Sequence, residues 1–136
     1  MQSVKRKITV LALAALLALG AMFALAACNG SEPAPTGVKE ITTTQQTSGN
    51  VRFTNYQAII SADTDWNNMS DADKQKIIDY TFTESRKEAA DNDVTNYNII
   101  GVREDSVVLF MWDKTNDQVF VYKDGQPAGN LPVPAE

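Results

Sequence analysis

Histidine is absent from this 136-residue sequence, and cysteine occurs only once, at Cys28. Without an imidazole, the chain cannot form the Ser-His-Asp or Cys-His arrangements of nucleophilic catalysis. Without histidine and with a single thiol, it also lacks the usual ligands for zinc. The chemistry that remains is that of carboxylates and of cations held by oxygen ligands.

Clustered glycine and positive charge are also scarce. Gly101, Gly125 and Gly129 are isolated, so the sequence has no glycine-rich phosphate loop. All 17 acidic residues follow Cys28, whereas three of the 12 basic residues precede it, which leaves a net charge of −8 after that cysteine. Binding to a polyanion depends on Lys and Arg neutralising phosphates, so nucleic acid is not expected as a partner.

One long apolar run is present, from Ile8 to Leu25, and it follows the basic residues Lys5, Arg6 and Lys7. A basic start, an apolar middle and small residues at the end are typical of a secretory signal peptide. The run is 18 residues long, just enough to span a bilayer. An uncleaved anchor and a plain secretory signal are therefore alternatives, and all of these readings place the rest of the chain outside the cytoplasm.

The end of this run, Leu25-Ala26-Ala27-Cys28, resembles the lipobox of bacterial lipoproteins, which reads Leu, a small residue, Ala or Gly, then Cys. In that class the cysteine thiol receives a diacylglyceryl group and becomes the first residue after cleavage. The resemblance implies a signal peptide over residues 1–27, lipidation at Cys28 and attachment to the membrane through the lipid. The implied location is the bacterial cell membrane or the outer membrane, with the domain facing outside the cytoplasm.

Residues 28–50 are expected to be the lipidated cysteine followed by a disordered tether. The segment is rich in Gly, Pro, Thr and Gln, and Val38 and Ile41 are its only large apolar residues after the cysteine. Such a composition buries too little apolar surface to fold alone. The folded domain is therefore expected to begin at Val51.

The first element of that domain is ambiguous. Val51 and Phe53 alternate with polar residues as in a strand, whereas Tyr56, Ile59 and Ile60 have helical spacing. We favour a short helix over residues 51–61, with a strand as the alternative.

A long amphipathic helix is predicted from Asp71 to about Ala90, a segment without Gly or Pro. Ser70 followed by Asp73 resembles a capping box, and acidic residues in the first turn suit the helix dipole. The apolar positions recur with a period of 3.6 residues. The predicted buried stripe consists of Ile77, Ile78, Thr81, Phe82, Ser85 and Ala89.

Three strands are predicted next, because short polar loops separate segments rich in β-branched and aromatic residues. They cover Tyr97–Val102, Val107–Trp112 and Val119–Tyr122. Short loops indicate antiparallel neighbours. The predicted fold class is α+β, with one main amphipathic helix packed on a three-stranded antiparallel β-meander and preceded by a short helix or strand. The domain is expected to cover 51–126, followed by an extended proline-containing tail over 127–136.

The spacing of Asp63, Asp65 and Asn67 resembles the start of a calcium loop. The sixth position is Asn68 and the twelfth is Lys74, where such a loop needs Gly and Glu. A polar turn before a helix explains these residues, so no metal and no cofactor are predicted.

The strongest candidate for a binding surface is the sheet face that one helix cannot cover, because both faces of the middle strand are apolar. The residues assigned to this surface are Val108, Phe110, Trp112 and Tyr122. Burial in the core is the alternative for the aromatic residues. The predicted function is a non-enzymatic, lipid-anchored binding module of the cell envelope that docks a protein partner or a second copy. A small extracytoplasmic carboxylate-dependent hydrolase is the alternative.

Overall fold

The structure is a computed structural model that describes residues 33–136. Residues from Ala34 to Glu136 form one compact unit. The predicted signal peptide, the lipobox and Cys28 lie outside the described residues.

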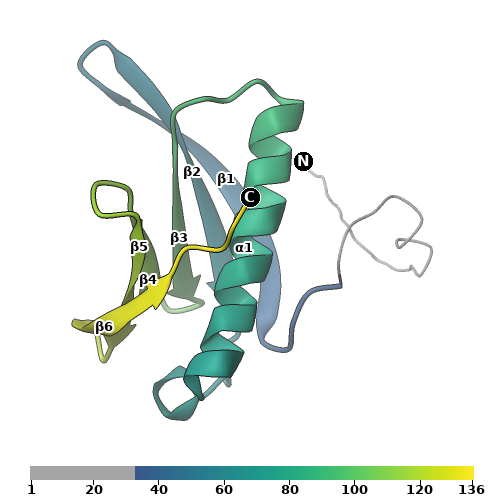
Figure 1. Ribbon diagram of the computed structural model, residues 1–136, viewed down its shortest axis with the longest axis vertical. Coiled ribbons are helices and arrows are strands. Elements are labelled where there is room, and N and C mark those ends of the chain that lie inside the picture. Colours follow the sequence, from purple (N-terminus) through teal and green to yellow (C-terminus); the bar gives the residue numbers. More distant parts are fainter. Residues whose placement is uncertain (1–32) are drawn as a thin grey trace. The chain divides into compact units, whose positions relative to one another are not determined.

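The described residues form a six-stranded sheet in which the strands follow one another in chain order (Figure 1). A single α-helix, α1, and a short 3-10 helix, η2, complete the described fold. The elements are β1 (Val38–Ser48), β2 (Val51–Ile60), η2 (Trp66–Asn68), α1 (Asp71–Asp91), β3 (Tyr97–Arg103), β4 (Val108–Asp113), β5 (Gln118–Lys123) and β6 (Gln126–Pro132).

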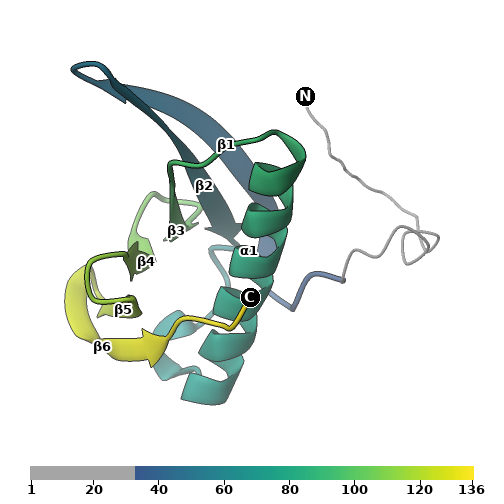
Figure 2. The same cartoon turned by 45° about the horizontal axis from the view of Figure 1, so that its top comes forward.

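The sheet is mixed because β2 and β3 run parallel, whereas every other neighbouring pair is antiparallel. Parallel neighbours need a long crossover connection, and α1 provides it. The helix lies along one face of the sheet, as the two views in Figure 1 and Figure 2 show. We call the face that packs against α1 the inner face and the opposite one the outer face.

The helix begins and ends close to the positions predicted from sequence. The Ser70 side chain accepts a hydrogen bond from the Asp73 backbone N–H at 3.1 Å, which caps the first turn. All six residues of the predicted stripe are buried, from Ile77 to Ala89. The Thr81 hydroxyl donates to the Ile77 carbonyl at 2.7 Å, so this buried polar group is satisfied within the helix.

The first two strands correct the sequence interpretation. The disordered tether predicted over 28–50 is wrong for residues 38–48, which form β1, and Val38 and Ile41 pack against the core. The helix favoured for 51–61 is also wrong, and the alternative of a strand is correct, because β2 occupies this segment. Alternate residues of β2 are buried from Thr54 to Ile60, which is the period-two pattern of a strand. A weak β1 sequence becomes ordered because β2 supplies its backbone partners.

The three-stranded meander is contradicted as well. Strands β3, β4 and β5 lie where three strands were predicted and are antiparallel neighbours, but they are half of a larger sheet. The extended tail predicted over 127–136 is wrong for its first residues, because β6 pairs with β5. Pro127 and Pro132 are tolerated there because β6 is an edge strand, where a missing N–H donor does not interrupt a ladder on both sides. The broad class remains α+β.

Over residues 33–136, no helix combines the length and the apolar character that a membrane span requires.

Candidate functional site

The inner face of the sheet is a closed hydrophobic core. Residues that pair across neighbouring strands point to the same face of a sheet. On the inner face, Tyr56 pairs with Ile99. Gly101, Phe110 and Val121 lie opposite one another across β3, β4 and β5. Their large side chains are almost fully buried together with those of α1. The inner face is therefore occupied by the fold itself.

Phe110, one of the predicted binding residues, is part of this core. Its exposed fraction is 0%, and its ring stacks on Trp66 with centroids 5.8 Å apart. The ring also lies over Gly101, where an added Cβ would come within 2.1 Å of it. The Trp66 indole N–H donates to the Tyr122 carbonyl at 3.1 Å, which holds this aromatic stack against β5.

Trp112, a second predicted binding residue, also packs on the inner face. Its ring meets Phe82 of α1 edge-on at 5.4 Å between centroids and contacts Tyr97 at 5.8 Å. The Lys114 ammonium lies 5.3 Å from the centroid of the Trp112 ring and donates to the Tyr97 carbonyl at 2.8 Å. Phe110 and Trp112 are thus packed residues, and the assignment of a docking surface to them is corrected.

A β-bulge in β4 explains why the four predicted residues do not share a face. Gly101 pairs with Phe110 and the next residue, Val102, pairs with Val108, so Leu109 is an extra residue without a partner opposite. An inserted residue resets the alternation of side chains. Val108 therefore lies on the outer face, and so does Tyr122, which shares its side of β5 with Phe120.

The outer face carries a second apolar surface. Its residues come from β2 to β5, and none belongs to the core beneath α1. We call it the outer patch, and its members are Ile59, Ile100, Val102, Val108, Met111, Phe120 and Tyr122. Met111 is 36% exposed, Val102 is buried, and the remaining side chains are half-buried.

The register arranges the outer patch in two cross-strand rows. Ile100 pairs with Met111, which in turn pairs with Phe120. In the neighbouring row, Val102 lies between Ile59 and Val108. Side chains opposite one another on adjacent strands are close enough to touch, so the two rows form a continuous apolar surface.

Next to the outer patch, the same face becomes polar. The Asn55 amide donates to the Gln46 side-chain oxygen at 2.8 Å, and the Asn98 amide donates to the Asn55 oxygen at 3.2 Å. This chain of amides crosses β1, β2 and β3 towards the β1–β2 hairpin. It gives the outer patch a polar, uncharged border on that side.

The sequence pattern places Val108 and Tyr122 in the binding surface. The neighbours Ile59, Ile100, Met111 and Phe120 complete this surface and follow only from the register of the strands. A glycine inside a strand is a signal for a bulge or for a close approach of another group. Gly101 has both properties, because the bulge lies next to it and Phe110 covers it. A bulge predicted at Gly101 would have placed Val108 and Phe110 on opposite faces of the sheet.

Two acidic side chains in the loop between β3 and β4 form exposed ion pairs. Glu104 accepts from Lys39 at 2.7 Å and from the Ala62 backbone N–H at 2.8 Å, and Asp105 pairs with Arg103 at 2.8 Å. The hydrogen bond from Lys39 is the main cause that lowers the pKa of Glu104, and the hydrogen bond from Arg103 does the same for the pKa of Asp105. A general acid needs the opposite shift, so these carboxyls give no support to hydrolase chemistry.

The three residues with the spacing of a calcium loop form hydrogen bonds with different partners. Asp63 accepts from the Ser61 hydroxyl, Asp65 accepts from Asn68 at 2.9 Å, and Asn67 donates to Asp124 at 2.9 Å. Within residues 33–136, no group of three or more acidic, His or Cys side chains is arranged to hold a metal ion.

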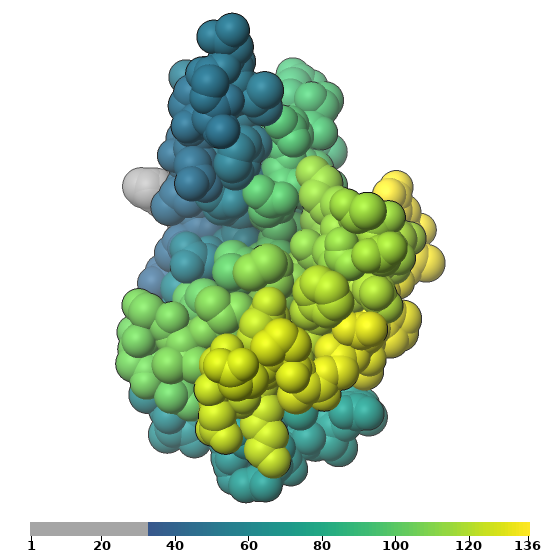
Figure 3. Space-filling view, turned by 90° about the vertical axis from the view of Figure 1, so that its left-hand side faces the viewer, coloured from purple at the N-terminus to yellow at the C-terminus, as the bar shows by residue number. Residues whose placement is uncertain are grey.

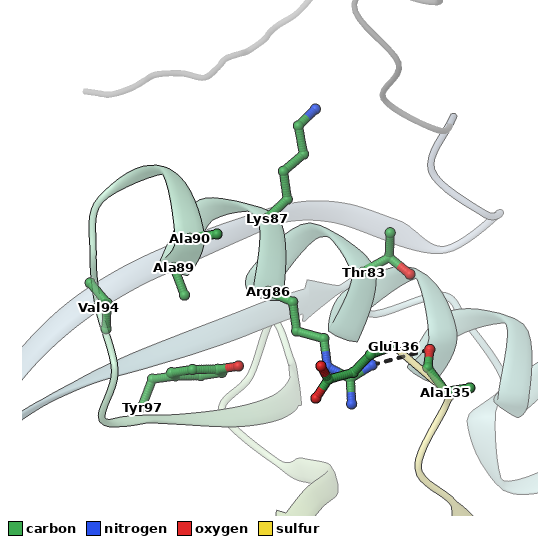
Figure 4. A pocket seen from close by; sticks show the side chains of 9 residues that line it. All are labelled: Thr83, Arg86, Lys87, Ala89, Ala90, Val94, Tyr97, Ala135 and Glu136. Carbon is green, nitrogen blue, oxygen red and sulfur yellow. Dashed lines mark hydrogen bonds between the residues drawn. The ribbon is translucent and has the colours of Figure 1, made fainter.

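Two open cavities in residues 33–136 lie away from the outer patch. The larger, of about 430 Å³, lies between the end of α1, Tyr97 and the last residues of the chain (Figure 4). Arg86 crosses it to donate to the Pro134 carbonyl at 2.9 Å. The smaller, of about 290 Å³, lies beside the start of β3 and is lined by Arg52 and Asn96, among others.

Comparisons of the chain with family models, with curated proteins and with solved structures found no match.

Proposed function

We propose that this protein is a lipid-anchored, non-enzymatic binding module of the bacterial cell envelope that docks a protein partner on its outer patch. The observation that carries the proposal is the outer patch itself. It places seven apolar side chains on the sheet face opposite α1. Contiguous apolar surface of this kind is a common mark of an interaction site.

The shape and chemistry of the outer patch favour a protein over a small molecule. Small ligands are usually held in concave sites that bury most of their surface, whereas the residues of the outer patch line neither of the two cavities described above. Met111, Phe120 and Tyr122 belong to residue types that are enriched at protein interfaces. The polar border formed by Asn55 and Asn98 suits the rim of such an interface.

The anchoring part of the proposal depends on the lipobox resemblance at Leu25-Ala26-Ala27-Cys28. Acylation of Cys28 would hold the domain at a membrane surface, and its net charge of −8 would keep it away from anionic headgroups. Replacing Cys28 with Ser should leave unprocessed precursor and abolish acyl labelling in cells. A Cys28→Ser chain that is still processed and acylated would show that the anchor is elsewhere.

The docking surface is tested by photocrosslinking in the cells that make the protein. A photoreactive residue at Met111 in the full chain should cross-link to one defined protein. The same residue at Val51, which is 53% exposed and lies outside the outer patch, is the matched control and should not capture that protein. The captured protein is then purified and its affinity is measured for the Met111→Lys and Val51→Lys variants.

The expected result is a loss of at least tenfold in affinity for Met111→Lys and no change for Val51→Lys, since a buried unpaired charge is costly at an interface core. Equal affinity for both variants, or the same captured protein from both positions, would contradict docking on the outer patch.

A further inference from the structure

Strand β1 forms one edge of the sheet. It is 11 residues long and pairs with β2 alone among the described strands. In an antiparallel ladder, alternate residues direct their N–H and C=O groups away from the partner strand. The free side of β1 therefore presents a row of backbone donors and acceptors to solvent.

The features that normally protect such an edge are missing from most of β1. Edge strands are usually blocked by charged side chains, proline or bulges. Between Ile41 and Asn50 there is no charged residue and no proline, and the irregularity in pairing with β2 lies at the other end, between Val38 and Glu40. The β1–β2 hairpin also projects beyond the other strands, at the top of Figure 3.

We propose that two copies of this chain pair β1 with β1, antiparallel about a two-fold axis, to form one continuous sheet. The inference goes beyond the proposed function and rests on a different strand. Isologous contacts between copies are the commonest form of oligomer, and pairing about an axis normal to the sheet is antiparallel.

The distribution of charge favours a second copy at this edge. Each chain has a net charge of −8 after Cys28, so most surfaces of two copies repel each other. Arg52 is the only charged residue between Ile41 and Ala62, so the hairpin is where two acidic copies approach with little repulsion. Threonine pairs across strands are also favourable.

A pairing centred on Thr43 places the charges that β1 carries opposite neutral residues. Thr43 then lies opposite its own copy, while Lys39 faces Thr47 and Glu40 faces Gln46 of the second chain. No like charges are opposed. The axis normal to the sheet also places the two outer patches on the same side, so the dimer presents the patch twice and gains avidity for a repeated partner.

A charge swap at the two-fold axis tests the pairing. The full chain is purified from membranes in detergent, and its mass is measured by light scattering over a concentration series. Wild type should be a dimer at high concentration. Thr43→Lys should weaken the dimer at least tenfold, because it places two ammonium groups across the axis, and Thr43→Glu should do the same. Thr83→Lys, at an exposed position of α1, is the control and should remain dimeric.

The decisive step is to mix Thr43→Lys with Thr43→Glu chains, which should restore dimers because opposite charges then meet across the axis. Recovery also shows that both variants are folded. A monomeric wild type at every concentration, or a mixture that stays monomeric, would overturn the proposal. So would a dimer that is lost with Met111→Lys but retained with Thr43→Lys, because that result would assign self-association to the outer patch.

Discussion

The two faces of this sheet are made by the same strands, yet they differ in what their side chains contact. On the inner face, Tyr56, Ile99 and Phe110 are almost fully buried beneath α1. On the outer face, the neighbouring residues Ile100 and Met111 remain partly exposed. Alternate residues of one strand thus differ in role: the inner set is packed in the core, and the outer set forms the surface that we propose for docking.

The largest loss of stability is expected from a cavity at the centre of the inner face. Phe82 has an exposed fraction of 0% and touches Trp112 edge-on. Phe82→Ala should lower the free energy of unfolding by about 3 to 5 kcal/mol, because it leaves a cavity under the sheet. Urea unfolding measures the loss, and Phe120→Ala on the outer face is the control. Equal losses for the two variants would erase the distinction between the faces.

The buried Tyr56 hydroxyl should make stability depend on pH in the alkaline range. Burial is the main cause that raises the pKa of Tyr56 from 10.0 to about 12. Below pH 10 both the folded and the unfolded chain keep the proton, so the full stability is present. Between pH 10 and 12 the unfolded chain ionises first, and stability should fall by about 2 to 3 kcal/mol.

Other groups titrate in the same range, so the measurement is the difference between wild type and Tyr56→Phe in urea melts from pH 9 to 12. Between pH 10 and 12, the free energy of unfolding of wild type should fall relative to that of Tyr56→Phe. Parallel pH profiles for the two proteins would mean that the Tyr56 hydroxyl is more accessible to water than the inner face implies.

A smaller loss is expected from filling the space above Gly101. Its missing side chain leaves room for the Phe110 ring, which an added Cβ would approach to 2.1 Å. Gly101→Ala should cost about 1 to 3 kcal/mol because a packed ring must shift. The double variant with Phe110→Leu should recover part of this loss. No recovery would indicate strain in the backbone of the bulge rather than contact with the ring.

The smallest effect on stability is expected on the outer patch. Met111 is the most exposed member of the patch, so Met111→Ala should change the free energy of unfolding by less than about 0.5 kcal/mol. Thermal unfolding monitored by circular dichroism suffices. A loss as large as that of a core residue would show that the outer face is held by packing and not left for a partner.

Much of the inner face was predictable from sequence, because α1 shows its capping residue and its buried stripe from Ile77 to Ala89 without reference to other elements. A regular helix satisfies its own backbone, so its signal is local. The strands β3, β4 and β5 were found for a similar reason, since their β-branched and aromatic residues stand between short polar loops.

Strand β1 was missed, and a strand was only the alternative for β2, because the local sequence of neither segment separates a strand from its competitors. β1 is rich in Thr and Gln and has little apolar surface, so nothing local separates it from a flexible segment. In β2, the helical spacing of Tyr56, Ile59 and Ile60 competed with the correct period of two. The parallel register with β3, such as Ala58 beside Gly101, is set by tertiary contacts alone.

The candidate site was only half predictable. An uncovered apolar face was expected, and Val108 and Tyr122 lie on it, but the bulge at Leu109 moved Phe110 and Trp112 to the other side. A strict alternation assigns side chains correctly only up to an inserted residue. Gly101 was the one local sign of the insertion.

The agreement between strand order and chain order has a consequence for how the protein folds. Four of the five strand pairings join neighbours across short turns, and only the β2–β3 pairing must wait for α1 to be made. Local contacts form quickly, whereas closure over a long segment is slow. During synthesis from the N-terminus, the β1–β2 hairpin is therefore expected to form while the far side of β2 has no neighbour. That side of β2 is the place where an incomplete chain is most open to mispairing, and the arrival of β3 ends the exposure.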